Sequence, residues 1–454
     1  RGLQAFRASG GHTVVIDYNE GTGVTLGLAT PGTGTERFQN LTITEFTDVT
    51  LTSDIVVQGL FQVDADNAVS AGGFDLHVAG GWTDLEGPTL FDQVFLTGDP
   101  SVLPPTILSN VFVDAPVTVP NNTTVSGDLT IRNTLTLGTR TVTVDLGGNV
   151  VVTGANGRLV MQNSAGVLDA DNDVTFDGAS HNGYLTNGVL HVGGAFTSLN
   201  THSTQAFLAT VGHTVVFDGG VAQTVDLADA DVETGQRFMG LIVTNGSAIN
   251  ATSTLPVDGD LTIVAGSSLN ATTLEFTDGN LSDASGGLTV ELIDLYGGPA
   301  AFPSTVAADV FMNADWDLPG NVTVNGDVQV LRSFNPSGFA LNVNGNVDVS
   351  TFNGRIEMFT TGDLVDILGD LTFDGGPTGG YMTDGTIRVG GNFLALNNNS
   401  NTSFSASGSH IVILDGTAAQ YVDLAIPGQT TQHFENLTIE NESATVDFLS
   451  GVRV

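Results

Sequence analysis

Cysteine and lysine are both absent from the 454 residues of this chain. Without cysteine there can be no disulfide bond, no thiolate metal ligand and no cysteine nucleophile, so stability has to come from packing and hydrogen bonds. The chain has 11 arginines and 49 acidic residues, which gives a formal net charge of -38. Because such a charge repels nucleic acid and anionic membrane surfaces, neither is an expected partner.

Long apolar runs are missing as well. No stretch of about 18 apolar residues occurs, so the sequence offers no membrane-spanning helix. Proline is confined to 14 positions, whereas 58 residues are glycine and 41% of the chain is hydrophobic. This combination favours short strands separated by many turns, with enough apolar residues for a continuous core.

An internal repeat of about 200 residues organises the chain. Its anchor is a histidine that opens a run of β-branched residues, and the anchors are His12, His213 and His410, spaced 201 and 197 residues apart. A phenylalanine follows each anchor in register, at Phe38, Phe238 and Phe434. The repeat predicts four segments: the end of a preceding copy at 1-11, copy 1 at 12-212, copy 2 at 213-409 and the start of copy 3 at 410-454.

A shorter unit recurs inside each copy, in which a glycine followed by aspartate or asparagine separates two runs of alternating β-branched residues. The glycines Gly326, Gly345, Gly369 and Gly391 are 19, 24 and 22 residues apart. That spacing matches one coil of a parallel β-solenoid, in which each coil buries its apolar face by stacking on its neighbours. We interpret the Gly-Asp and Gly-Asn pairs as coil corners where the backbone needs a positive φ.

The sequence therefore predicts an all-β chain, a parallel β-solenoid with coils of about 19-24 residues nested in the long repeat. Some 20 coils spaced about 4.8 Å apart would make a rod on the order of 100 Å long. A string of antiparallel β-sandwiches stays open as the alternative, because Gly-Asp and Gly-Asn pairs also suit hairpin turns.

These motifs resemble one group of known proteins. The segments 125-131 (VSGDLTI) and 213-219 (HTVVFDG) are similar in composition to the large bacterial β-strand-repeat surface proteins, including filamentous-haemagglutinin-like and autotransporter-passenger-like adhesins. The resemblance covers essentially the whole chain. It implies an exported, fibrous role at the cell surface or outside the cell.

Histidine is the first residue type to consider for catalysis. The anchors His12, His213 and His410 share one repeat position, and architecture is copied whereas a catalytic site is normally unique, so we interpret them as satisfying local hydrogen bonds. Asp177 and Asp374 also share a position, and each precedes a glycine as turn residues do. Four further histidines are not shared between copies and have no evident base or metal partner: His77, His181, His191 and His202. We expect no catalytic residues and no required cofactor.

Calcium is the most plausible ligand for the acidic residues, since alternating or turn-borne carboxylates can supply the oxygen shell that Ca²⁺ prefers. Two groups have this pattern: Asp169, Asp171 and Asp173 in one, and Asp229, Asp231 and Glu233 in the other. Neither matches an EF-hand loop, and neither is repeated in the other copy. Solvated acidic corners are the alternative interpretation.

Twelve Asn-x-Ser/Thr sequons are present. In a chain rich in asparagine and threonine most of them arise from composition, so glycosylation is one interpretation and a structural asparagine the other. The candidates are Asn40, Asn122, Asn250, Asn270, Asn321, Asn401 and Asn436.

From these observations we expect a non-enzymatic structural segment of an extracellular fibre or filament, or a cell-surface adhesin stalk. Its expected partners are copies of itself or adjoining repeats of a longer chain, and surface glycans are a further possibility. The alternatives are a carbohydrate-active β-solenoid enzyme, such as a polysaccharide lyase or hydrolase, and a glycan-binding module, because one fold can host unrelated functions.

Overall fold

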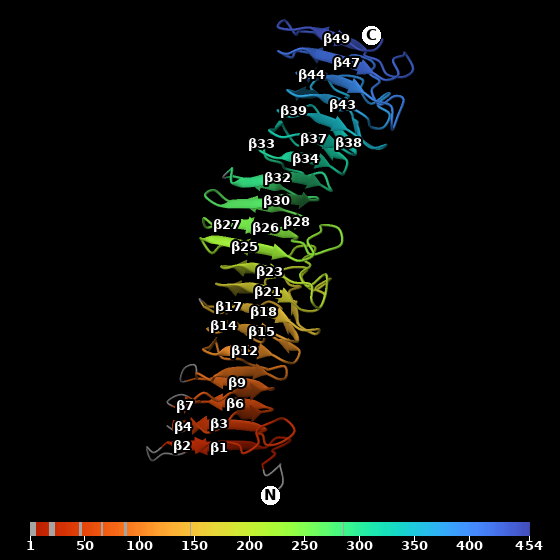
Figure 1. Ribbon diagram of the computed structural model, residues 1–454. Coiled ribbons are helices and arrows are strands. Elements are labelled where there is room, and N and C mark those ends of the chain that lie inside the picture. The colour runs from red at the N-terminus through yellow and green to blue at the C-terminus, as the bar shows by residue number, and fades with distance from the viewer. Residues whose placement is uncertain are drawn as a thin grey trace. The chain divides into compact units, whose positions relative to one another are not determined.

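The computed structural model describes residues 6–17, 23–44, 48–64, 67–85, 89–145, 147–284 and 286–454. Residues 1–5 of the segment expected at 1-11 lie outside the described residues. The described residues form strands and turns without a helix, and the strands pair in parallel into a β-solenoid of about 22 residues per turn (Figure 1). This finding confirms the predicted fold class and excludes the antiparallel sandwich.

The chain divides into two compact units, Arg1–Asn250 and Ala251–Val454. The longest sheet of the first unit runs through β5 (Ile55–Val57), β8 (Leu76–Val78), β10 (Gln93–Leu96), β12 (Asn110–Val113), β15 (Leu129–Ile131), β18 (Val150–Thr153), β21 (Val174–Asp177), β23 (Phe196–Ser198), β25 (Ala222–Leu227) and β27 (Ala248–Ala251). A second sheet runs through β11 (Thr106–Ile107), β14 (Thr123–Val125), β17 (Thr141–Val144), β20 (Val167–Ala170), β22 (Val189–Val192), β24 (Thr214–Phe217) and β26 (Gly240–Val243).

Three shorter sheets complete the first unit. One contains β1 (Thr13–Asp17), β3 (Asn40–Thr44), β6 (Leu60–Val63) and β9 (Gly81–Asp84). Another contains β2 (Val24–Leu26), β4 (Asp48–Leu51) and β7 (Ala68–Ser70), and the third contains β13 (Val117–Thr118), β16 (Thr134–Thr136) and β19 (Arg158–Val160).

The second unit has the same arrangement of stacked parallel strands. Its longest sheet runs through β28 (Leu255–Val257), β30 (Ser268–Phe276), β32 (Leu288–Leu295), β34 (Asp309–Met312), β37 (Val328–Val330), β40 (Val347–Val349), β43 (Leu371–Phe373), β45 (Phe393–Ala395), β47 (Gln420–Leu424) and β49 (Val446–Phe448). A second sheet of this unit contains β33 (Thr305–Val306), β36 (Val322–Val324), β39 (Ala340–Val343), β42 (Leu364–Ile367), β44 (Thr386–Val389), β46 (Ile411–Leu414) and β48 (Asn436–Ile439). A third sheet contains β35 (Trp316–Asp317), β38 (Ser333–Asn335) and β41 (Arg355–Ile356). The strands β29 (Leu261–Ile263) and β31 (Leu281–Asp283) pair with each other.

Alternation along the strands decides which side chains form the core. Successive residues of a strand point to opposite faces, so every second one lies inside the coil, as the buried Val111 and Val113 of β12 do. The anchor-following residues Phe38, Phe238 and Phe434 are all buried, as the repeat predicts.

Phenylalanine clusters occupy matching positions in the two units. In the first unit the ring centroids of Phe196 and Phe207 are 4.8 Å apart, and in the second unit those of Phe393 and Phe404 are also 4.8 Å apart. All four side chains are completely buried. Such ring pairs contribute about 0.5–1.5 kcal/mol beyond the burial of their area. The copied sequence therefore builds a copied core.

The Gly-Asp and Gly-Asn corners are held by a ladder of side-chain hydrogen bonds between coils. In this ladder, the Oδ1 atom of a corner aspartate or asparagine accepts the backbone N–H of the residue at the same corner one coil later. Asp327 accepts the N–H of Asn346 at 2.7 Å, and Asp370 accepts the N–H of Asn392 at 2.7 Å. We name this the corner ladder, and the further residues that accept an N–H in it are Asp54, Asn110, Asp128, Asp173, Asp260, Asp309 and Asn346.

The corner glycines are needed for a reason other than the expected one. None of Gly326, Gly345, Gly369 and Gly391 has a positive φ, so that interpretation was wrong. Instead, the coils approach each other closely at these corners: a Cβ atom on Gly345 would lie 2.5 Å from the carbonyl oxygen of Gly326. Only glycine fits against the preceding coil at that distance.

Candidate functional site

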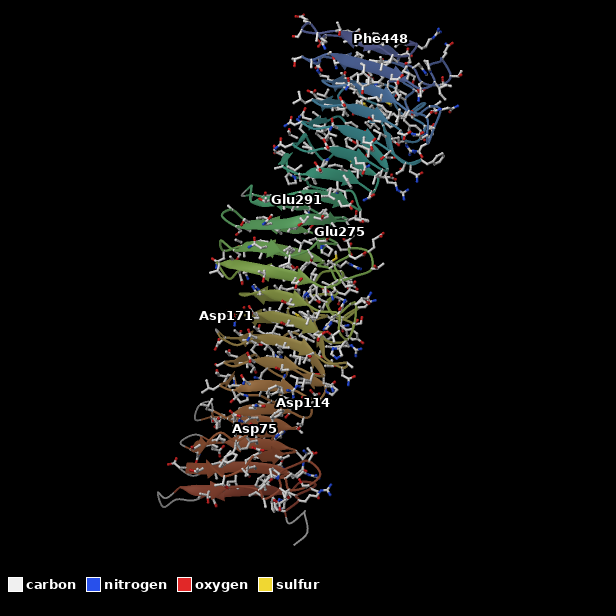
Figure 2. The ribbon with its side chains drawn as sticks, in the orientation of Figure 1. Asp75, Asp114, Asp171, Glu275, Glu291 and Phe448 are labelled. Carbon is white, nitrogen blue, oxygen red and sulfur yellow. The ribbon has the colours of Figure 1, made fainter. Side chains whose placement is uncertain are left out.

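The first acidic group predicted to bind calcium is spread along a strand and a corner. Asp169 lies on β20 beside His191 of β22. Asp171 is exposed at the edge of its coil (Figure 2). Asp173 belongs to the corner ladder, where it accepts the N–H of Ala195 at 2.7 Å. Burial raises the pKa of Asp169, with His191 opposing it. Asp173 thus has a structural role, and calcium binding by this group stays a prediction.

The second acidic group forms a turn after β25. Oδ1 of Asp231 accepts the N–H groups of Glu233 at 2.8 Å and Thr234 at 2.6 Å. Burial alone would raise the pKa of Asp231, but the hydrogen bonds from Thr234 and Glu233 outweigh it and lower that pKa. Asp229 is half-buried and Glu233 is exposed. The arrangement is that of an Asx turn, in which the carboxylate caps its own backbone.

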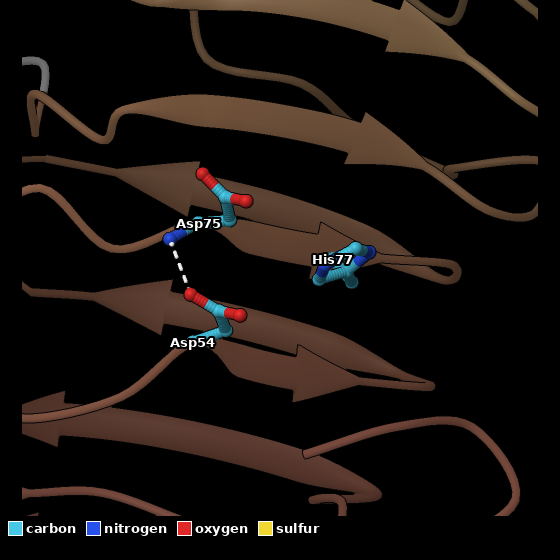
Figure 3. Close-up of side chains that lie close together, drawn as sticks. All are labelled: Asp54, Asp75 and His77. Carbon is cyan, nitrogen blue, oxygen red and sulfur yellow. Dashed lines mark hydrogen bonds between the residues drawn. The ribbon is translucent and has the colours of Figure 1, made fainter.

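A different group brings metal-ligating atoms together. Asp54, Asp75 and His77 each offer one ligand atom, and these atoms lie within 4.8 Å of one another. Within the described residues no other group of three histidines or acidic residues meets that criterion. Figure 3 shows Asp54 and Asp75 at the starts of neighbouring strands, joined by the hydrogen bond from the N–H of Asp75 to Oδ1 of Asp54, 3.1 Å long.

The sequence contains a signal for this group, although the proximity of His77 to Asp54 and Asp75 was not predicted. Asp54 and Asp75 are 21 residues apart, which is one coil, and Asp75 and His77 are two residues apart, which places them on one face of the chain. Strand register then fixes their positions, since β5 pairs with β8 through Ile55 with Leu76. A coil-by-coil alignment would have paired the two aspartates.

His77 is held by an outward-facing stack of rings. Its imidazole lies against Phe95 at 4.5 Å with an interplanar angle of 8°, and Phe95 lies against Phe112 at 4.9 Å. The guanidinium of Arg132 covers the far face of Phe112 at 4.2 Å. Burial lowers the pKa of His77, although Asp75, Asp54 and Asp114 oppose it. The stacking on Phe95 fixes the orientation of the ring.

Two other unshared histidines have acidic neighbours that the sequence did not reveal. His191 Nδ1 donates to Oδ2 of Asp218 at 2.7 Å, and this hydrogen bond raises the pKa of His191. At the equivalent position of the second unit, Arg388 Nε donates to Oδ2 of Asp415 at 2.8 Å. His202 Nδ1 donates to the backbone carbonyl of Asp177 at 2.9 Å. Each contact joins neighbouring coils.

The buried histidines also bind the preceding coil. His213 and His410 have no exposed surface, and their Nδ1 atoms donate to the carbonyl oxygens of Asn187 and Asp384, both at 2.9 Å. His181 is equally buried and its Nε2 accepts the N–H of Leu159. The anchor His12 differs from its two counterparts, because it is exposed. The interpretation that the anchor side chains satisfy local hydrogen bonds is confirmed for His213 and His410.

Several sequon asparagines serve the coil corners. The amide nitrogens of Asn40 and Asn436 donate to the carbonyl oxygens of His12 and His410, while the amide oxygens of Asn122 and Asn321 accept N–H groups from the next coil. The side chains of Asn250, Asn270 and Asn401 are exposed. Because glycosylation attaches to the amide nitrogen, Asn40 and Asn436 are the least suited of these residues.

No helix in the described ranges is long and apolar enough to cross a membrane. No protein-family model, no curated protein and no solved structure matches this chain.

Proposed function

We propose that this chain is a structural segment of an extracellular fibre, filament or adhesin stalk, in which stacked coils provide length and stiffness. Its partners would be further coils of a longer chain or copies of itself. The resemblance to bacterial β-strand-repeat surface proteins supports an exported role. The acidic surface suits such a role, because a charge far from zero keeps an exposed shaft soluble.

The observation that carries the proposal is the use of buried polar side chains as ties between coils in both units. Gln223 Nε2 donates to the carbonyl oxygens of Val192 at 2.8 Å and Gly194 at 2.9 Å. Its counterpart Gln420 Nε2 donates to those of Val389 at 2.8 Å and Gly391 at 2.6 Å. A buried polar group left unpaired would cost about 1–3 kcal/mol, so these ties specify how coils stack.

The corner ladder adds the same kind of support along the outside. Its rungs repeat in both units, and each joins one coil to the next through a backbone N–H. Repeat proteins of this kind gain stability from nearest-neighbour interfaces, so adding coils lengthens the shaft without changing its cross-section.

Negative-stain electron microscopy of the native material tests the proposal, with fibres or surface projections as the expected result and compact particles as the contrary one. Incubation of the purified chain with neutral and acidic polysaccharides, followed by measurement of new reducing ends, tests the enzymatic alternative. Turnover of any of these polymers that is lost on unfolding the chain would contradict a purely structural role.

A further inference from the structure

The N–H of Asp75 and Oδ1 of Asp54 form one hydrogen bond of the corner ladder, and His77 lies two residues beyond Asp75. One ligand atom from each of Asp54, Asp75 and His77 lies within 4.8 Å of the other two. We infer that these three residues bind a divalent transition-metal ion, best matched by Zn²⁺, on the outer face of β5 and β8. This inference is independent of the proposed structural function.

The donor set selects the class of metal. One imidazole nitrogen with two carboxylate oxygens suits zinc and its neighbours, whereas calcium prefers six to eight oxygen ligands. Three protein ligands and one open position for water is a common zinc arrangement. Zinc holds nitrogen and oxygen ligands at about 2.0–2.2 Å, so the three ligand atoms would draw closer together around the ion.

An occluded oxygen supplies independent support. Oδ1 of Asp75 is shielded from solvent and accepts no hydrogen bond from the described residues. A buried carboxylate oxygen without a donor is costly, and a bound cation removes that cost while cancelling the repulsion between Asp54 and Asp75.

The imidazole is prepared for a metal by its neighbours. Val56 lies on one side of His77 in the strand register and Phe95 stacks on the other. Packing of this kind fixes the ring plane, as the outer-shell contacts of metal-ligating histidines do.

The second unit provides a natural comparison. There β28 pairs with β30 through Leu255 with Leu274 and Pro256 with Glu275, in the same register as β5 with β8. The residues at the three ligand positions are Thr254, Thr273 and Glu275. This set lacks the imidazole and both aspartates, so the metal site belongs to the first unit alone.

Calorimetric titration of the metal-stripped, full-length chain with ZnCl₂ tests the inference. Asp54→Asn keeps the oxygen that accepts the N–H of Asp75, and His77→Phe keeps a ring against Phe95, so both variants retain the local packing. We expect each to weaken the tightest Zn²⁺ site at least about tenfold. Glu275→Gln also removes one negative charge, at the position of the second unit that corresponds to His77, and should leave that site unchanged. Circular dichroism of every variant checks that the strands form.

Three outcomes would overturn the inference. One is a Zn²⁺ titration identical in the parent chain, Asp54→Asn and His77→Phe, since binding would then lie at other histidines. Another is equal weakening by Asp54→Asn and Glu275→Gln, which would indicate diffuse attraction to the acidic surface. The third is displacement of Zn²⁺ by equimolar Ca²⁺, which would indicate an oxygen site for hard cations.

Discussion

Acid should destabilise the first unit through His213, and the size of the effect follows from its surroundings. Burial lowers the pKa of His213 to about 4, while its hydrogen bond to the carbonyl of Asn187 acts weakly in the opposite direction. In an unfolded chain the histidine pKa is about 6.5. Between these two values the unfolded chain binds a proton that the folded chain does not, so stability falls as the pH falls.

The magnitude can be worked out from that difference. One pKa unit corresponds to about 1.4 kcal/mol, so the loss due to His213 is about 2 kcal/mol at pH 5 and about 3 kcal/mol at pH 4. The full contribution is present above pH 6.5 and is lost across the window below it. His213→Asn keeps an N–H donor but does not titrate, so it removes this pH dependence.

The test compares the free energy of unfolding of His213→Asn with that of the parent chain at several pH values. His213→Asn should be less stable than its parent at pH 7 by about 1–2 kcal/mol, because the smaller side chain leaves a cavity, and the deficit should disappear by pH 5. Urea unfolding followed by the fluorescence of Trp82, in a Trp316→Phe background, reports on the first unit, since Trp82 is fully buried there. His410→Asn, in the second unit, is the matched control.

Parallel pH profiles for His213→Asn and its parent between pH 7 and pH 5 would refute the reasoning, since His213 would then be protonated equally in both states. A change caused by His410→Asn in the Trp82 signal would show that the signal does not isolate the first unit. Because both chains carry the same carboxylates, their titration cancels in the comparison.

Three further predictions concern the ties between coils. Gly345→Ala should destabilise the second unit by about 1–3 kcal/mol or more, because its Cβ would meet the carbonyl of Gly326, and hydrogen exchange of the adjoining coils should rise; unchanged exchange would contradict the close-approach argument. Asp370→Ala should cost about 1–3 kcal/mol by leaving Asn392 without its acceptor, whereas Asp370→Asn keeps Oδ1 and should shift the urea midpoint far less; equal shifts would rule out the ladder. Phe393→Ala should cost about 3–5 kcal/mol through the cavity it leaves, and a thermal midpoint within 1 °C of the parent would show that the cluster relaxes to fill it.

The sequence by itself determined the period and the core. Alternating residues and recurring glycines identify the coil because a parallel stack requires each coil to present its apolar face at the same place as its neighbours. For the same reason the register of Phe38, Phe238 and Phe434 was enough to predict their burial. These are properties of the repeat, and any repeat is visible along the chain.

Only the tertiary structure decided which residues of different coils meet. The 21-residue spacing of Asp54 and Asp75 fits one coil, but coil lengths vary, so the proximity of both to His77 depends on the register of β5 and β8. It also showed that Gly345 is required by the backbone of the coil beneath it and not by its own φ. His12 is exposed while His213 is buried, because burial depends on the coil that covers a residue and not on the residue type.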